Sequence, residues 1–343
     1  MGRLNLIALT HWITAAAVDH PTRLDAEIVA RTGASLRSAR HAIRRLRELQ
    51  WLALEGTALR PRSPRHRPGL LRQVIRRYEL AGLAEDQPWE LDYAPYFALS
   101  PELNRLVQHA FCELLNNAID HSGGSHVTIS MRQTPSHLQL LVSDNGSGLF
   151  KRIAETFSID NPRLAMLELS KGKLTSQPLR HRGEGLFFTS RLADVFDLHA
   201  NDAAFRQLAW DDGWQPQRAL AQHGTSVYAS FALDTPRTLD AVRRAHSLDG
   251  RGVALERTQV PLRLLASARV GLESRSQARR AAARLASFRH AEIDFAGLAD
   301  VGHAFVDELF RVIPLETPAL ALSATNMAPR VAEMVESVRL SAS

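Results

Sequence analysis

Cysteine, lysine and long apolar runs are scarce in this sequence. The single cysteine, Cys112, excludes an internal disulfide and is typical of a reducing cytoplasm, where we expect this protein. No apolar run reaches the roughly 18 residues of a membrane span and no signal-peptide pattern is found, so we expect no membrane partner. Almost all of the 42 Lys and Arg residues are arginine, the exceptions being Lys151, Lys171 and Lys173.

The composition is otherwise that of an ordinary globular protein, with 45% hydrophobic and 23% charged residues, and 343 residues suit two or three domains. The net charge of +6 is unevenly distributed, because residues 1–72 hold thirteen arginines and five acidic residues while the remainder is close to neutral. A basic amino-terminal module suggests a nucleic-acid partner.

The first segment, residues 1–62, predicts three helices followed by a short hairpin. Apolar residues over Leu4–Val18 and Leu24–Arg31 predict the first two helices, and Ser35 can cap a third. The apolar stripe of this third helix consists of Leu36, Ala39, Ile43, Leu46 and Leu49.

The opposite face of the third helix is basic and carries Arg37, Arg40, His41 and Arg44. With a wing formed by Trp51–Leu54 and Thr57–Leu59, the segment resembles a winged helix-turn-helix, whose third helix enters the major groove of DNA. The resemblance implies that these four side chains contact DNA. A solvated arginine face on a structural helix is the alternative.

Residues 63–98 connect this module to the next segment. The proline-broken basic stretch over residues 60–68 predicts a linker. The stretch Leu70–Leu83 predicts a helix, and residues 84–98 predict an irregular crossing.

The second segment, residues 99–234, contains polar residues with spacings suited to nucleotide chemistry. Glu113 and Asn117 are four residues apart in a long helical pattern, so their side chains share one helix face. An asparagine carbonyl suits magnesium, which prefers oxygen ligands with water and phosphate completing its octahedron. A neighbouring carboxylate can orient a water molecule for attack on a terminal phosphate. Such a pair by itself is more often a solvated face.

Further motifs follow in the same segment. Asp144 ends a strand-like run, where a carboxylate can accept a hydrogen bond from an adenine amino group, and Gly146 and Gly148 allow backbone to approach a base. Gly183 and Gly185 precede a helix, whose first amides favour phosphate. A threonine, Thr225, then opens another strand.

Together these motifs resemble the GHKL superfamily of gyrase, the heat-shock chaperone, the mismatch-repair ATPase and the histidine kinases. The resemblance covers residues 105–232 and implies a Bergerat α/β sandwich that binds ATP and Mg²⁺. It implies that Glu113 is the general base, that Asn117 ligates magnesium and that Asp144 reads adenine. The other pocket residues that it implies are Gly146 and Gly148 at the base, Gly183 and Gly185 under the phosphates, and Thr225 beside the aspartate.

The resemblance also implies that residues 149–182 form a mobile lid over ATP. All three lysines fall in this stretch, and one could meet the γ-phosphate, although solvated lysines are equally expected. Phe187 stands where kinases of the superfamily have an extra glycine, so the phosphate cradle departs from theirs. His121 could approach phosphate, but a histidine at a helix end is more often structural.

The third segment, residues 250–343, alternates strand and helix, which predicts a small sheet covered by helices. The predicted strands are 259–266, 292–295 and 319–323, and the predicted helices are 274–288, 303–312 and 329–338. The stretches Ser274–Arg280, Ile293–Leu298 and Val301–Phe310 resemble a STAS-like domain of unknown function that accompanies this kind of ATPase.

Two consequences follow for the chemistry of this tail. Bacterial anti-sigma antagonists carry a phosphorylated serine in the loop after the middle strand, but residues 299–304 contain no Ser or Thr, so we expect no phospho-switch there. We expect Asp294, Asp307 and Glu308 in strand-end and helix-surface positions rather than in a catalytic cluster.

The sequence therefore predicts a multidomain α/β (α+β) protein. Its predicted parts are a winged helix over 1–62, a linker and helix over 63–98, an ATP-binding domain over 99–234 and a STAS-like domain over 250–343. The leading hypothesis is a bacterial transcription regulator that binds DNA and is gated by Mg-ATP, with the last domain docking a regulatory protein or sensing a signal.

Two other functions fit the same motifs. One is an anti-sigma-type or two-component-like protein kinase that phosphorylates a separate protein. The histidine-kinase version is disfavoured because no second helical hairpin with a phosphoacceptor His followed by Glu and Pro precedes the ATPase. The other is a nucleotide-binding scaffold with little turnover.

Overall fold

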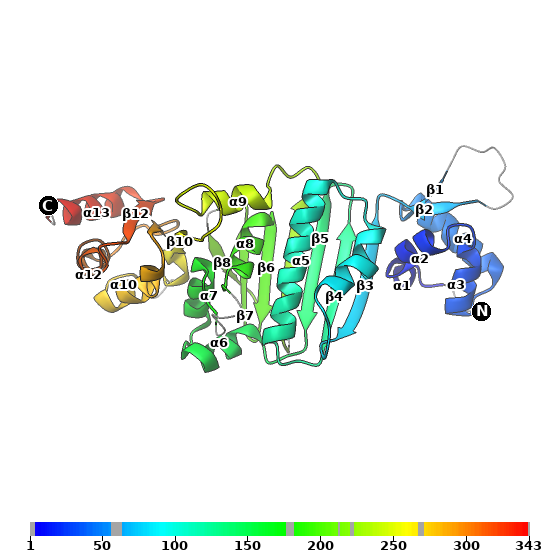
Figure 1. The fold of residues 1–343 in the computed structure, drawn as a ribbon, viewed down its shortest axis with the longest axis horizontal. Helices are drawn as coiled ribbons and strands as arrows, with labels where there is room; N and C mark the ends of the chain where they lie inside the picture. Colours follow the sequence, from blue (N-terminus) through cyan, green and yellow to red (C-terminus); the bar gives the residue numbers. More distant parts are fainter. Residues whose placement is uncertain are drawn as a thin grey trace.

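The computed structural model describes residues 4–55, 64–175, 182–211, 213–219, 223–266 and 271–341. They form an amino-terminal helical unit, a central sheet covered by helices, and a smaller parallel sheet with its own helices. Figure 1 shows the first and last of these units at opposite ends of the central sheet. No helix among these residues is both long enough and apolar enough to cross a membrane.

The amino-terminal unit combines short helices with a two-stranded antiparallel sheet. Its elements are α1 (Leu6–Thr10), α2 (Ile13–Asp19), α3 (Leu24–Thr32), α4 (Leu36–Glu48), β1 (Leu52–Leu54) and β2 (His66–Pro68). The helix α4 begins where the Ser35 hydroxyl accepts a hydrogen bond from the Ser38 amide at 3.2 Å, as the sequence predicts. Ala39, Ile43 and Leu46 of its apolar stripe are buried in the core of this unit.

The two-stranded sheet differs from the predicted wing. Its first strand, β1, lies within Trp51–Leu54, but its partner is β2, in the predicted linker, with Leu52 opposite Pro68. The predicted second strand, Thr57–Leu59, lies outside the described residues. The two paired strands are therefore further apart in the sequence than predicted.

The central unit is an antiparallel sheet of seven strands in the order β3-β4-β5-β9-β6-β7-β8. Its strands are β3 (Arg72–Glu79), β4 (His126–Gln133), β5 (His137–Asp144), β6 (Val195–Ala200), β7 (Ala203–Leu208), β8 (Trp214–Gln217) and β9 (Thr225–Ala232). Alternate residues of β4, namely Val127, Ile129 and Met131, are fully buried, so one face of the sheet is apolar.

Helices cover this apolar face. They are α5 (Pro101–His121), α6 (Leu149–Phe157), α7 (Pro162–Lys171), α8 (Gly185–Leu192) and α9 (Leu239–Ala245), preceded by the short turns η1 (Pro88–Tyr93) and η2 (Ala94–Tyr96). The longest, α5, starts at a Ser100 cap followed by proline, and its apolar side packs on the sheet.

The helix predicted over Leu70–Leu83 is wrong, because this stretch contains the strand β3. It pairs with β4 from Arg72, opposite Gln133, to Glu79, opposite His126. Val74 is fully buried and Arg77, three residues later, is exposed, which fits a strand and not one face of a helix. Pairing with the sheet overrides the local helical period, so the central sheet includes residues before 99.

The carboxy-terminal unit has the strand and helix order that the sequence predicts. Three parallel strands, β10 (Arg257–Pro261), β11 (His290–Asp294) and β12 (Ala321–Thr325), lie side by side in that order. The intervening elements are η3 (Leu262–Leu264), α10 (Arg275–Ala282), η4 (Leu285–Ser287), α11 (His303–Asp307), η5 (Glu308–Val312) and α12 (Ile313–Glu316), and α13 (Pro329–Ser341) follows β12.

The acidic residues of this unit take two kinds of position. Asp294 ends β11, as predicted. The helix-surface prediction for Asp307 and Glu308 is wrong, because both are buried. Arginines cover them: Arg311 pairs with Asp307 at 2.5 Å and Arg279 with Glu308 at 2.6 Å.

The described residues contain two hydrophobic cores, and α2 contributes Ala15 to the larger one. One lies within the amino-terminal unit. The other is continuous from the central sheet into the carboxy-terminal unit and includes Leu255, which joins them. The last two units therefore share a core, whereas the first has its own.

Candidate functional site

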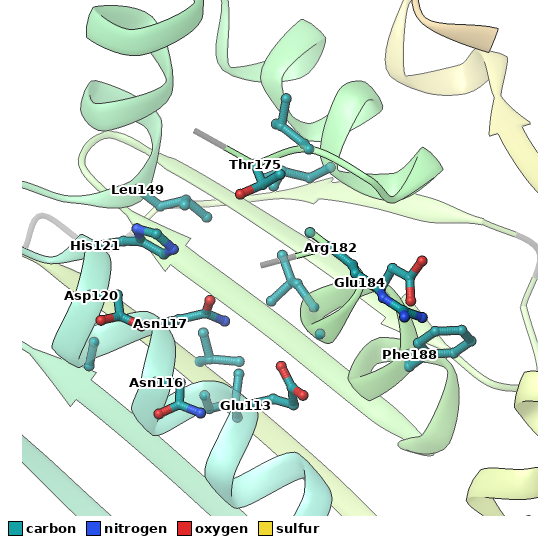
Figure 2. Close-up of a pocket in the computed structure, with 18 of the residues that line it drawn as sticks. Glu113, Asn116, Asn117, Asp120, His121, Leu149, Thr175, Arg182, Glu184 and Phe188 are labelled. Carbon is teal, nitrogen blue, oxygen red and sulfur yellow. The ribbon is translucent and has the colours of Figure 1, made fainter. Parts of the chain in front are cut away.

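A cavity of about 650 Å³ opens between α5, α8, the α6–α7 segment and the sheet. Figure 2 shows Glu113 and Asn117 of α5 on one side of it, and Arg182, Glu184 and Phe188, at and before the start of α8, on the other. Cavities of this size hold small ligands and cofactors.

The helix α5 brings Glu113 and Asn117 to this cavity because its opposite side is fixed by the sheet. Phe111 and Leu115 are fully buried there, so residues at the intervening positions face away from the sheet. Glu113 and Asn117 both line the cavity, together with His121 one turn further on. The shared face predicted from their spacing is therefore present.

Asp144 and Thr225 meet at the ends of two paired strands, β5 and β9. The Asp144 Oδ1 atom accepts hydrogen bonds from the amides of Gly146 at 2.8 Å and Thr225 at 3.2 Å. No hydrogen bond from the described residues reaches Oδ2, and Asp144 lines the cavity. Burial raises the pKa of this carboxyl, and the two amide hydrogen bonds oppose that rise.

Gly185 lies directly against the Glu113 carboxylate. A Cβ atom at residue 185 would lie 1.9 Å from Glu113 Oε2, so any larger residue here would require the Glu113 carboxylate to move. Gly183, which has a φ of +66°, lines the same cavity. The structure thus brings both glycines of this motif to the cavity beside the carboxylate.

Gly146 and Gly148 lie outside the cavity lining and allow close contacts between the segments around it. A Cβ atom at Gly146 would lie 2.1 Å from the carbonyl oxygen of Ser122, at the end of α5, and one at Gly148 would meet the Asn201 side chain at 2.5 Å. Neither residue is among the described residues that line the cavity. Their close contacts join the β5 end to α5 and to the β6–β7 turn.

The lysines do not face the cavity as phosphate ligands. Lys171 is fully buried, with Nζ 2.6 Å from Glu168 Oε1 and 2.9 Å from the carbonyl of Ala283, so neither predicted environment, phosphate or solvent, is correct for it. Lys173 donates to the carbonyl of Ser287 at 2.7 Å. Lys151 is exposed.

The basic side chains that line the cavity are arginines, which the sequence motifs did not single out as ligands. They are Arg152 of α6, Arg182 before α8 and Arg243 of α9. The segment Gly252–Leu255 also lines it. Arg243 and this segment follow the last motif in the chain, so no local pattern indicated them.

Two partly buried imidazoles, His109 and His246, lie in this part of the structure, and His109 lines the cavity. His109 Nδ1 is 3.8 Å from Glu113 Oε1, and burial, aided by the nearby Arg243 charge, lowers the pKa of His109 to about 4. Burial next to Arg191 lowers the pKa of His246 to about 3, with its ring packed edge-on against Phe187. Both are therefore neutral at pH 7.

Comparison with known families agrees with this geometry. Residues 102–231 match the family described as histidine kinase-, DNA gyrase B- and HSP90-like ATPase, and residues 278–331 match the STAS-like domain of unknown function. The chain therefore contains a GHKL-type ATP-binding domain and a STAS-like domain. A search of curated proteins finds no match. The cavity-lining residues Arg243 and Gly252–Leu255 lie outside both matched ranges.

We expect the free energy of unfolding to fall as the pH drops below about 6.5. The pKa values of His109 and His246 in the folded protein are lower than the pKa of about 6.5 of a histidine in the unfolded chain. Their contribution to the free energy of unfolding is therefore fully present above pH 6.5, and it is lost at lower pH because the unfolded chain takes up protons first. Between pH 6.5 and its folded-state pKa, each histidine should lower the free energy of unfolding by about 1.4 kcal/mol per pH unit. Urea denaturation of the wild type and His246→Phe at a series of pH values measures this. An unchanged slope in the variant would contradict a neutral, buried His246.

Proposed function

We propose that the protein binds Mg-ATP in this cavity and hydrolyses it, and that the nucleotide regulates DNA binding by the amino-terminal unit. One observation carries the first part: a single cavity of about 650 Å³ is lined by Glu113, Asn117, Asp144 and the glycine start of α8. The match of residues 102–231 to the ATPase family supports the same reading.

The adenine end of the ligand belongs at Asp144. Its Oδ2 atom is an acceptor at a buried strand end, while Oδ1 is held by two backbone amides, which fixes the orientation of the carboxylate. Thr225 secures this arrangement from β9, because its hydroxyl accepts from the Leu149 amide at 3.0 Å. A carboxylate that only accepts selects an amino group over a carbonyl, and so adenine over guanine.

The phosphate end belongs between α5 and the start of α8. The glycines Gly183 and Gly185 leave room for backbone amides of a helix amino terminus, which favour anions. Asn117 would hold Mg²⁺ through its carbonyl oxygen, and the ion would neutralise charge on the phosphate oxygens. Glu113 faces the same space and would accept the proton of an attacking water.

DNA binding is proposed for α4. Arg37, Arg40, His41 and Arg44 are all exposed, so these side chains can reach a groove without opening the core. The core contacts of the helix are made by Ala39, Ile43 and Leu46, whereas Leu36 and Leu49 at the two ends of the predicted stripe are exposed. The side chain of Arg40 also pairs with Asp25 of α3 at 3.1 Å. The winged-helix interpretation of this unit is part of the proposal.

Asp144→Asn should lower ATP affinity by at least about tenfold, because the introduced amide donates toward the adenine amino group. Calorimetric titration with ATP and GTP, in the presence of Mg²⁺, measures this, and GTP should bind poorly to the wild type. Ser143→Ala is the matched control, since Ser143 bonds Ser226 on the other face of β5. Equal affinities of the wild type for ATP and GTP would refute adenine recognition.

Glu113→Ala should lower the hydrolysis rate by about 100-fold or more while ATP stays bound. Gly185→Ala should act in the same direction, because its Cβ would displace the Glu113 carboxylate. Release of radiolabelled phosphate from γ-labelled ATP measures both, with Glu102→Ala, exposed on the same helix, as control. Native turnover by Glu113→Ala would exclude it as the base. Label that accumulates on protein would favour the kinase alternative.

Arg37→Ala combined with Arg44→Ala should weaken DNA binding and flatten its salt dependence. Each phosphate neutralised contributes a slope of about −0.9 in log K against log salt, so two lost contacts should change it by about 1.8. These two are chosen because Arg40 also holds α3. Fluorescence anisotropy with duplex DNA at several salt concentrations measures the effect.

The control for this experiment removes two exposed arginines, Arg280 and Arg289, from the carboxy-terminal unit. It carries the same change in net charge and should leave the salt slope unaltered. An absence of salt-sensitive DNA binding by the whole chain, with and without ATP, would remove the DNA part of the proposal. The basic module would then be assigned to an acidic protein partner.

A further inference from the structure

The helix α7 separates the nucleotide cavity from the STAS-like domain. Leu169, Leu174 and Thr175, on α7 and just after it, line the cavity. Glu168 and Lys171, on the same two turns, point to the carboxy-terminal unit and are buried there. A single short stretch therefore forms one wall of the cavity and one side of a domain interface.

The interface contains an ionic cluster of the buried Glu168 and Lys171 with the partly buried Arg284, which connects the two matched domains. Glu168 accepts from Lys171 Nζ at 2.6 Å and from Arg284 Nη1 at 3.0 Å. Glu168 belongs to the ATPase match and Arg284 to the STAS-like match. Lys171 donates in addition to the carbonyl of Ala283, also in the STAS-like domain. Lys171, Glu168 and Arg284 thus connect the ATPase domain to the STAS-like domain through hydrogen bonds between charged groups.

Arg284 also completes the carboxy-terminal end of α7. Its Nη2 atom donates to the carbonyls of Gly172 at 3.3 Å and Lys173 at 2.5 Å. Carbonyls at a helix end lack partners within the helix and favour a cation. Arg284 itself has a φ of +64°, a left-handed conformation that is unfavourable for a non-glycine residue. The STAS-like domain therefore supplies a cation to the C-cap residue Gly172 and to Lys173, directly after α7.

The other side of α7 is tied to the helix that begins at the glycine motif. Arg191 of α8 is partly buried: its Nη2 donates to the carbonyl of Ser170 at 3.3 Å, and its guanidinium lies 3.5 Å over the Phe187 ring. Phe187 and Leu255 both lie so close to Gly172 that a Cβ there would meet them at 3.1 and 2.7 Å. The α7 end is thus packed between α8 and the STAS-like domain.

We propose that Arg284 is a positioning residue for the nucleotide site, through which the STAS-like domain holds the α7 wall of the cavity in its binding geometry. This inference rests on the proposed ATP binding. A change in the STAS-like domain that withdraws Arg284 would free the end of α7 and lower ATP affinity. By linkage, bound ATP would stabilise the contacts of Arg284 by the same factor.

Arg284→Met in the full chain tests this, because it keeps an unbranched apolar stem like that of arginine and removes the guanidinium, with its carbonyl hydrogen bonds and its ion pair. We expect the Kd and KM for ATP to rise by about tenfold with kcat changed much less, since a coupling between sites typically has this size. Arg284→Lys, which keeps the charge, should restore part of the affinity. Arg280→Met, at an exposed position four residues earlier, should have no effect.

Hydrogen exchange supplies a readout that a merely structural residue would not move. In the wild type, ATP should slow amide exchange at residues 283–288 of the STAS-like domain as well as at 168–174. In Arg284→Met the protection at 283–288 should be lost while that near Asp144 remains. If Arg284→Met does not fold, Glu168→Gln removes the carboxylate charge from the same cluster and should give the same pattern.

A folded Arg284→Met variant with wild-type Kd and wild-type exchange would overturn the inference. So would a variant that melts at a lower temperature yet binds ATP as the wild type does, because Arg284 would then act on stability alone. Failure of the proposed function has a different signature, namely no ATP binding by the wild-type chain itself.

Discussion

The central sheet has two edge strands, and each is covered by a different flanking unit. At β3, the Gln73 amide donates to the buried hydroxyl of Thr14, on α2, at 3.0 Å. Beyond β8, a Cβ at Gly213 would lie 3.3 Å from Pro261 and 3.4 Å from Asp294 of the carboxy-terminal unit. Exposed sheet edges pair with other chains, so covering them is a requirement of this fold. Because β3 and β8 are the first and last strands in the sheet order, the two flanking units lie at opposite ends of the sheet (Figure 1).

This arrangement gives the two flanking units unequal access to the cavity. The carboxy-terminal unit touches α7 directly, and the chain that leads into it, Gly252–Leu255, lines the cavity. The amino-terminal unit contacts the central unit at β3, through the Thr14–Gln73 hydrogen bond, and near the start of α5, where the Tyr96 hydroxyl lies 3.3 Å from Asp19 of α2, four residues before the Ser100 cap. The contact near the start of α5 thus connects the amino-terminal unit to the helix that carries Glu113, and the contact at β3 connects it to the sheet.

The parts that the sequence predicted well are those whose signals are local. Glu113 and Asn117 share a helix face by spacing alone, and the strand and helix order of the last unit follows from its periodicity. The prediction failed where a residue far away in the sequence determines the local structure or environment. The β3 stretch looks helical until β4 pairs with it, and Lys171 looks solvated until Ala283, more than a hundred residues later, covers it. Likewise, the need for glycine at 146 comes from Ser122.

The ionic cluster at α7 has a role that apolar packing could not fill. A largely buried cluster of one carboxylate and two cations adds little to stability, because removing the charges from water costs about as much as their attraction returns. Apolar contacts such as those of Leu255 would hold the domains together without fixing their register. Arg284, by contrast, makes directional hydrogen bonds to Glu168 and to the carbonyls of Gly172 and Lys173. A shift of α7 along the interface would break several of these hydrogen bonds at once and leave their polar groups without partners. Orientation of the cavity wall, rather than cohesion, is what these charges provide.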